Sequence, residues 1–143
     1  MRKQVFLGGT CGNNNWRDGL ISRLISRGIP PECLFNPVVE HWNEEAQRRE
    51  EIAKTDASYM LFFIADPRQE GINVSFYSVI EATMALYDEP KGTVVVFDTT
   101  GMGEHNTKAM NQACKVLKTR FPDANIFANL SEAEEWLAVQ LMP

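Results

Sequence analysis

Short apolar runs and longer amphipathic segments alternate along this chain of 143 residues. The run at 59–65 is continuously apolar, which is typical of a central parallel strand that is covered on both faces. The segment at 16–27 instead places its aliphatic residues on one face of a helix. Applied to the whole chain, the two patterns predict strands at 5–7, 34–38, 59–65, 93–97 and 125–127, and helices at 16–27, 43–55, 75–87, 107–120 and 131–141.

This alternation predicts an α/β fold, a single-domain, five-stranded parallel sheet that is doubly wound. Because crossovers between parallel strands are right-handed, we expect the flavodoxin-like or Rossmann-like strand order 2-1-3-4-5. Ligands of such sheets bind beyond the carboxyl ends of the strands, near the switch between strands 1 and 3. The functional site is therefore expected in the loops that follow these strands.

The composition narrows the class of protein. A hydrophobic content of 44% suits one compact domain over residues 1–143. The formal net charge is −5, the pI is near 5.0, and the Lys and Arg residues are scattered along the chain. Such a chain has no basic field for a phosphate backbone, so no nucleic acid is expected as a partner.

Cysteine usage and hydropathy bear on the location of the protein. Cys11, Cys33 and Cys114 lie far apart and without metal-binding spacing, so we expect reduced thiols. The chain shows neither a signal-peptide core nor an apolar run of about 20 residues. These features predict a soluble, cytoplasmic protein with no membrane partner.

Glu81 interrupts an apolar helical stretch and is the strongest candidate for chemistry. If the helix begins at Ser78, then Ser78 and Glu81 form a capping box that only stabilises the helix end. If it begins near Ser75, Glu81 lies in the second turn and faces the strand ends, where a carboxylate can act as a nucleophile. The residues alone leave both interpretations open.

Further candidates flank the predicted strands. Gly9 and Thr10 belong to a Gly-Gly-Thr turn that either brings backbone amides close to a ligand or simply makes a tight turn. Trp42 either stacks on a flat heterocycle or covers the edge of the core. Asp56 and Asp66 bracket the central strand; Asp56 suits a helix end or turn, whereas Asp66 lies where substrate hydroxyls would bind.

Asparagine and histidine residues in the loops have simpler interpretations. Asn13, Asn14 and Asn15 precede the first helix, and we expect them to supply its N-cap. His41 and His105 lie in predicted loops, and we expect solvated side chains rather than a metal site.

Four segments carry a resemblance to a known family: 5–10, Asn36-Pro37, 53–56 and 81–86. In these segments the chain resembles the nucleoside 2-deoxyribosyltransferase superfamily, which includes 2′-deoxynucleoside 5′-monophosphate N-glycosidases. The last segment looks like the family motif Glu-x-Gly-x-Ala, with Thr83 where a Gly is usual. The pair Trp16-Arg17, with the later Trp42, is most similar to the small deoxyribosyltransferase-like branch.

The resemblance implies a function for Glu81. It implies that Glu81 attacks C1′ of a 2′-deoxyribonucleoside, expels the base and forms a covalent deoxyribosyl-enzyme. A second base or water then takes the sugar from the same face. The implied partners are a nucleoside and a nucleobase, and no metal or other cofactor is required.

Three positions depart from the family pattern. An aromatic hydroxyl usually positions the nucleophile from strand 1, but this chain has Phe6 there, and Tyr77 is a candidate substitute. Six residues before the nucleophile, Ser75 stands where transferases carry an Asp and resembles the monophosphate glycosidases. The acid that assists base protonation has no secure counterpart: Glu50 and Glu51 are the nearest candidates, and an ungapped register gives Arg48.

The resemblance also implies a homo-oligomer in which a neighbouring subunit closes the site, here through Asn106. The apolar residues Phe76, Met84, Leu86 and Met110 suit either a dimer face or the core.

These inferences combine into one expectation and its rivals. We expect an N-deoxyribosyltransferase with Glu81 as nucleophile, in which Gly9, Thr10 and Ser78 line the sugar site and Trp42 lies near the base. The alternatives are a 2′-deoxynucleoside 5′-monophosphate N-glycosidase, a non-catalytic nucleotide-binding module, and a partner-binding domain without a ligand.

Overall fold

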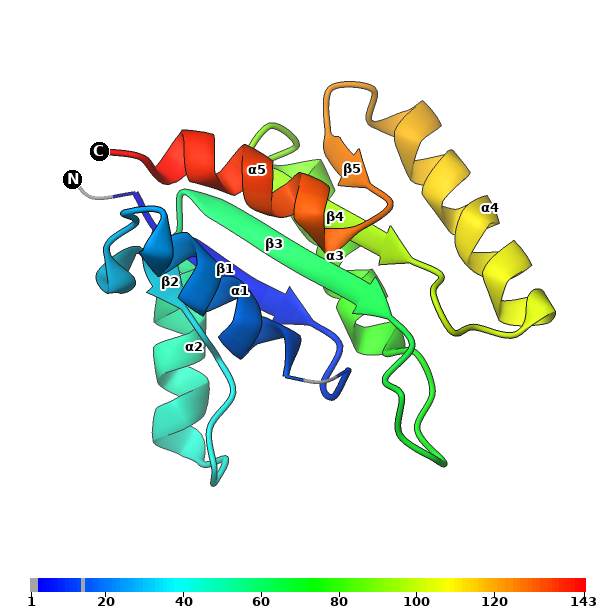
Figure 1. Cartoon of the computed structure of the whole chain (residues 1–143), viewed down its shortest axis with the longest axis horizontal. Helices are drawn as coiled ribbons and strands as arrows, with labels where there is room; N and C mark the ends of the chain where they lie inside the picture. Colours follow the sequence, from blue (N-terminus) through cyan, green and yellow to red (C-terminus); the bar gives the residue numbers. More distant parts are fainter. Residues whose placement is uncertain (1–2, 14) are drawn as a thin grey trace.

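The computed structural model of the protein describes residues 3–13 and 15–143, which form one parallel sheet flanked by helices (Figure 1). In chain order the elements are β1 (Val5–Gly9), α1 (Trp16–Ser26), a 3-10 helix (Pro31–Cys33), β2 (Leu34–Phe35), α2 (Glu44–Asp56), β3 (Tyr59–Ala65), α3 (Phe76–Asp88), β4 (Thr93–Asp98), α4 (Glu104–Arg120), β5 (Asn125–Phe127) and α5 (Leu130–Leu141). The strand order is β2-β1-β3-β4-β5 with every pair parallel, which confirms the predicted fold.

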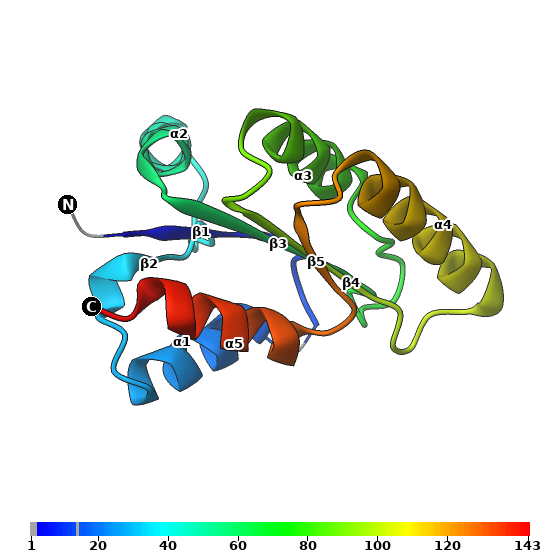
Figure 2. The ribbon, with the colours of Figure 1, turned by 90° about the horizontal axis from the view of Figure 1, so that it is seen from above.

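The helices form two layers on opposite faces of the sheet. Figure 2 shows α1 and α5 on one face and α2, α3 and α4 on the other. Strand β3 serves both layers: Leu61 and Phe63 pack on the side of α1 and α5, whereas Phe62 and Ile64 pack on the side of α3 and α4. Burial on both faces explains why the sequence of β3 is apolar at every position.

Two element bounds differ from the sequence prediction by three residues, and the differences elsewhere are smaller. Strand β2 ends at Phe35 rather than at 38, because Pro37 has no N–H for the ladder and the Val38 N–H donates to Asn36 Oδ1 at 3.0 Å. Helix α4 begins at Glu104 rather than at 107, and an acidic residue in the first turn favours this earlier start.

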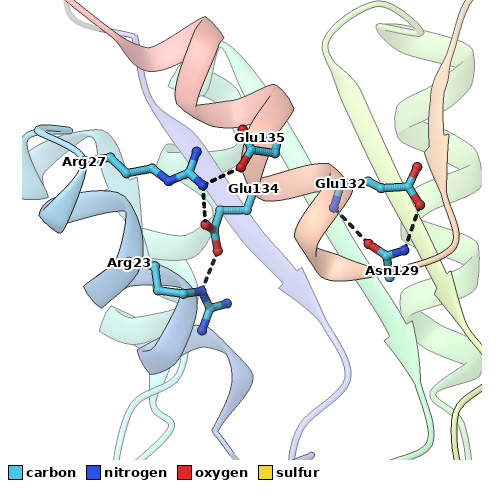
Figure 3. Close-up of polar contacts among 6 residues, drawn as sticks. All are labelled: Arg23, Arg27, Asn129, Glu132, Glu134 and Glu135. Atoms are coloured by element: carbon cyan, nitrogen blue, oxygen red, sulfur yellow. Dashed lines mark hydrogen bonds and ion pairs between the residues drawn. The ribbon is translucent and has the colours of Figure 1, made fainter.

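Side chains cap three of the helices. Asn43 accepts a hydrogen bond at the start of α2, and Ser75 accepts one from the Ser78 N–H at the start of α3. At the start of α5, the Glu132 N–H donates to Asn129, and the Asn129 amide donates back to the Glu132 carboxylate (Figure 3). These caps fix where each helix begins.

Helices α1 and α5 are joined by charged side chains (Figure 3). The largely buried Glu134 accepts from Arg23 Nε at 2.5 Å and pairs with Arg27 at 3.1 Å, and Arg27 also binds Glu135. These contacts are at the face of the molecule opposite to α2 and α3, so they hold the scaffold together and lie away from Glu81.

The three cysteines, Cys11, Cys33 and Cys114, are free. Within residues 3–13 and 15–143, no helix is both long and apolar enough to cross a membrane.

Strands β1 and β3 approach each other very closely where β1 ends. Gly9 has a φ of +115°, and a Cβ at this position would lie 2.3 Å from the Phe63 carbonyl oxygen. Any side chain at residue 9 would therefore push the two strands apart. Gly28, beyond the end of α1, also has a positive φ of +94°, but a Cβ there would meet no atom within 4 Å.

The two glycines allow the strand contact to be tested separately from backbone strain. We expect Gly28→Ala to lower the free energy of unfolding by about 1–2 kcal/mol, the cost of a left-handed conformation. Gly9→Ala adds a steric clash, and we expect a loss of about 2–5 kcal/mol. Urea denaturation of both variants measures the difference, and equal losses would contradict a close contact between Gly9 and Phe63.

Candidate active site in the groove between α2 and α3

Glu81 lies in a groove between α2 and α3, on the face of the sheet that these helices cover. Its side chain is 18% exposed, and its Oε2 accepts a hydrogen bond from Lys54 Nζ at 2.5 Å. Lys54 also pairs with Glu50 Oε1, one helical turn earlier in α2, at 3.1 Å. The three side chains form a row of carboxylate, ammonium and carboxylate that joins α2 to α3.

The position of Glu81 excludes one of the two interpretations of the sequence, the capping box. Helix α3 begins at Phe76 with Ser75 as its N-cap, so Glu81 lies in the second turn, as the catalytic interpretation predicts. A capping box is excluded, because the Ser78 N–H is bound by Ser75 and the Glu81 carboxylate binds Lys54. Its orientation differs from the prediction, since the side chain points toward α2 and not toward the strand ends.

The groove is large and mixes charged with apolar walls. Its cavity volume is about 590 Å³, within the range of small-molecule sites. It is lined by Lys54, Thr55, Met60, Tyr77, Ile80, Glu81, Met84, Ala85, Asp88 and Glu89. The buried Phe6 ring of β1 lies with its centroid 5.3 Å from Lys54 Nζ, a cation–π contact.

Lys54 is held in its charged form. Burial disfavours the ammonium, but hydrogen bonds to Glu81 and Glu50 and the charges of these carboxylates outweigh it and raise the pKa of Lys54 above its ordinary value. A raised pKa means that the cation persists at every pH at which the protein would be assayed.

Lys54 is the partner of Glu81 that sequence reasoning missed. Tyr77, the expected substitute for the absent hydroxyl of strand 1, lines the same groove but is largely exposed, and the hydrogen bond to Glu81 comes from Lys54 instead. Of the two acidic candidates on α2, Glu50 faces Lys54 whereas Glu51 is exposed. A spacing of four residues between Glu50 and Lys54 was the available signal.

Thr10, at the end of β1, is buried and its hydroxyl serves the scaffold. The hydroxyl donates to the Ala65 carbonyl at 3.1 Å and accepts from the Ala65 N–H at 3.2 Å, while the Thr10 N–H donates to the Phe63 carbonyl. With Gly9, these contacts fasten the end of β1 to β3.

Arg17 fixes the same turn from α1. The guanidinium is buried and donates to the carbonyl oxygens of Leu7, Gly9 and Thr10, at 2.9, 3.0 and 3.0 Å. Burial lowers the pKa of Arg17, against the opposing influence of nearby Cys11, Glu50 and Asp18. The Trp16 indole N–H donates to the Thr10 carbonyl as well, at 2.7 Å.

A second group of predicted residues gathers at the carboxyl ends of β3 and β4. Asp66 and Asn106 line a small pocket of about 70 Å³, and Asn106 also lines an apolar pocket beside Phe76, between α3 and α4. Asp66 Oδ1 accepts from the Arg68 N–H at 3.0 Å. Ser75 caps α3, and Ser78 is buried against the sheet.

Other predicted residues are not brought to Glu81. Trp42 is 58% exposed in the loop before α2. Asp56 is the last residue of α2, just before the amino end of β3, whereas Asp66 follows the carboxyl end of the same strand. Of the apolar residues considered for a dimer face, Leu86 and Met110 are buried in the core, whereas Phe76 and Met84 are exposed.

The asparagine and histidine predictions have mixed outcomes. Asn15 occupies the N-cap position of α1 with a left-handed backbone and without a side-chain cap, Asn13 donates to the Asp66 carbonyl, and Asn14 lies outside the described residues. His41 is exposed in a loop, but His105 is exposed within α4. In the part of the chain that the structure describes, no three His, Cys, Asp or Glu side chains are grouped to hold a metal ion.

Comparison with known families gives a match over more than half of the chain. The family described as nucleoside 2-deoxyribosyltransferase-like matches residues 2–100, from before β1 to the end of β4. The chain therefore belongs to the nucleoside 2-deoxyribosyltransferase-like family, and the resemblance inferred from the sequence is confirmed. The matched range includes Glu81, Lys54 and Arg17 but not Asn106. No curated protein matches the chain significantly.

The role of Arg17 in holding the turn is testable by its removal. We expect Arg17→Met to lower the free energy of unfolding by about 2–4 kcal/mol, because buried carbonyl oxygens lose a charged donor. Arg49→Met removes the same charge from an exposed position on α2 and should cost less than about 0.5 kcal/mol. Urea denaturation compares the two, and similar losses would show that the hydrogen bonds of Arg17 contribute little.

Proposed function

We propose that the protein is a nucleoside 2-deoxyribosyltransferase, which exchanges the bases of 2′-deoxyribonucleosides with Glu81 as the nucleophile. The observation that carries the proposal is the placement of Glu81: a largely buried, ion-paired carboxylate in a groove of about 590 Å³ within the family-matched part of the chain. A buried carboxylate is costly to maintain, and such groups concentrate at functional sites.

The proposed reaction has two displacements at C1′. In the first, a Glu81 oxygen forms a bond to C1′ as the bond from C1′ to the base nitrogen breaks, and the base keeps that electron pair and takes a proton. In the second, a nitrogen of the incoming base bonds to C1′ and loses its proton, and the Glu81 carboxylate leaves. Two inversions retain the configuration, and a carboxylate suits the oxocarbenium-like transition states.

The substrate contacts remain proposals around this nucleophile. We assign the sugar to the region of Gly9, Thr10 and Ser78, with Thr10 acting through the shape of the turn because its hydroxyl is bound to Ala65. Trp42 is assigned to the base, and its exposure leaves its ring free to stack.

Asp66 is assigned to a sugar hydroxyl, and Asn106 of a neighbouring subunit to closure of the site. Asp56 is the assignment with least support, because it lies at the amino end of β3, whereas Asp66 lies at the carboxyl end. Glu50 is the candidate for assisting base protonation, since it is paired with Lys54, which lines the groove.

The unpaired cysteines support the proposed cytoplasmic location.

Ser75 favours a second candidate, hydrolysis of 2′-deoxynucleoside 5′-monophosphates. Ser75 is the N-cap of α3, and helix N-termini bind phosphate through their free N–H groups. It precedes Glu81 by six residues, or about 9 Å along the helix axis. In this alternative water replaces the incoming base in the second displacement.

The transferase proposal predicts base exchange that depends on Glu81. With deoxyinosine and adenine, we expect the wild type to form deoxyadenosine, and Glu81→Gln to lose activity by a factor on the order of 10³ or more, as for other removed nucleophiles. Chromatography of the products measures both. Glu45→Gln makes the same chemical change at an exposed position of α2 and should retain full activity.

Each other result in this assay points to a rival. Free base and deoxyribose 5-phosphate from monophosphates alone would indicate the glycosidase. Nucleoside binding that is equal in wild type and Glu81→Gln, without turnover in either, would indicate a binding module. Full activity of Glu81→Gln would contradict the proposed nucleophile.

We also propose that α3 forms a subunit interface. Phe76, Ile80, Met84 and Tyr87 recur at helical spacing, and each is more than half exposed, which leaves an apolar stripe beside the groove. A second subunit on this stripe would lie next to the active site, as the expected closure by Asn106 requires.

The interface proposal predicts that a charge on the stripe separates the subunits. Phe76 is 81% exposed, and Phe76→Glu should convert an oligomeric wild type to monomers, because a carboxylate would be buried without a partner. Val139 on α5 is 72% exposed, and Val139→Glu should leave the oligomer intact. Light scattering after gel filtration gives the masses, and a monomeric wild type would refute the proposal.

A further inference from the structure

Lys54 lies between two carboxylates and touches both. Its ammonium is 2.5 Å from Glu81 Oε2 and 3.1 Å from Glu50 Oε1, and it rests over the Phe6 ring. All three charged side chains are less than a quarter exposed. The network therefore links α2 to α3 at the proposed nucleophile.

Every titratable group near Glu81 can be assigned to an element. Helix α2 contributes Lys54 and Glu50, whereas α3 and the residue after it contribute Tyr77, Asp88 and Glu89. The strands beneath contribute the apolar side chains of Phe6 and Met60. Among the described residues that line the groove, Lys54 is the one cation, and Arg17 of α1 adds a second positive charge near Glu50.

The two oxygens of Glu81 have different surroundings. Oε2 is bound by Lys54, whereas among the described residues Oε1 has no hydrogen-bond donor. The carboxylate is thus held at one oxygen, and the other remains available for attack on C1′.

Lys54 does not suit the role of proton donor to the leaving base. The two carboxylates raise the pKa of its ammonium, which strengthens its hold on the proton. Its proton therefore stays in place while Glu81 alternates between carboxylate and ester.

We propose that Lys54 is the positioning residue of this site: held by Glu50, its ammonium keeps Glu81 ionised and directs one oxygen of Glu81 toward the sugar. This inference rests on the proposed function, because it assigns Lys54 a role in that reaction. Lys54 forms and breaks no covalent bond.

The inference makes a specific claim about ionisation. Without Lys54, Glu50 and Glu81 would be neighbouring carboxylates in a partly buried groove, and like charges at short range disfavour the ionised form. The Glu81 carboxyl should then remain protonated to a higher pH. Removing the charge of Glu50 as well should relieve much of this effect.

The experiment follows the Glu81 carboxyl directly and also through activity. Carbon-13 NMR of labelled glutamate carboxyls, with the Glu81 signal assigned from Glu81→Gln, gives the pH at which this group titrates. In Lys54→Met we expect titration about 1–2 pH units higher than in wild type. In Lys54→Arg and in Lys54→Met combined with Glu50→Gln, the signal should return most of the way to the wild-type position.

The pH profile of base exchange should change in parallel. For Lys54→Met, the acidic limb of the kcat/KM profile should move to higher pH by the same 1–2 units. At a pH well below this limb, the activity should therefore be about 10–100-fold lower than that of the wild type. Lys54→Arg should restore the wild-type profile. Lys118→Met, which removes an exposed cation of α4, should change neither the titration nor the profile.

The outcomes separate this inference from the proposed function. An active wild type whose Glu81 titration and pH profile are unchanged in Lys54→Met would overturn the role of Lys54 and leave the transferase intact. The same upward shift in Lys118→Met would also overturn it, because the effect would then come from net charge. A wild type without base exchange would overturn the proposed function whatever the NMR titration shows.

Discussion

The close approach of β1 and β3 at their carboxyl ends is the constraint on which the rest of the structure depends. A side chain at Gly9 would clash with Phe63, and the Thr10 hydroxyl is hydrogen-bonded to Ala65. Arg17 donates hydrogen bonds to carbonyl oxygens of β1, including that of Gly9. These contacts fix β1 beside β3 with Phe6 opposite Met60. Because that register is fixed, the Phe6 ring contacts Lys54 and the groove lies between α2 and α3.

The groove concentrates charge where the surrounding fold is apolar. Lys54 separates the carboxylates of Glu50 and Glu81, and each charge thereby has a partner at hydrogen-bond distance. Paired in this way, a carboxylate can stay ionised although it is mostly removed from water. A paired carboxylate on a helix, beside a cavity of small-molecule size, suits the glycosyl transfer through a covalent intermediate that we propose.

Sequence patterns predicted the structural features that depend on residues close together in the chain. Features that depend on contacts between distant segments were not predictable in this way. The apolar run of β3 and the alternation of elements predicted the sheet order, and the start of α3 near Ser75 predicted that Glu81 lies in the second turn. The partner of Glu81 was not predictable in the same way, because Lys54 is 27 residues earlier on another helix. The buried role of Arg17 also depends on how α1 packs on the sheet.

The central claim is that Glu81 carries the sugar during the reaction. The most direct measurement is mass spectrometry of acid-quenched protein after brief mixing with deoxyinosine in the absence of an acceptor base, followed by peptide mapping. We predict that a fraction of the wild type gains the mass of one deoxyribosyl group on the peptide that contains Glu81, and that Glu81→Gln gains none. An adduct on a different peptide, or base exchange in which no adduct on Glu81 ever forms, would contradict the account.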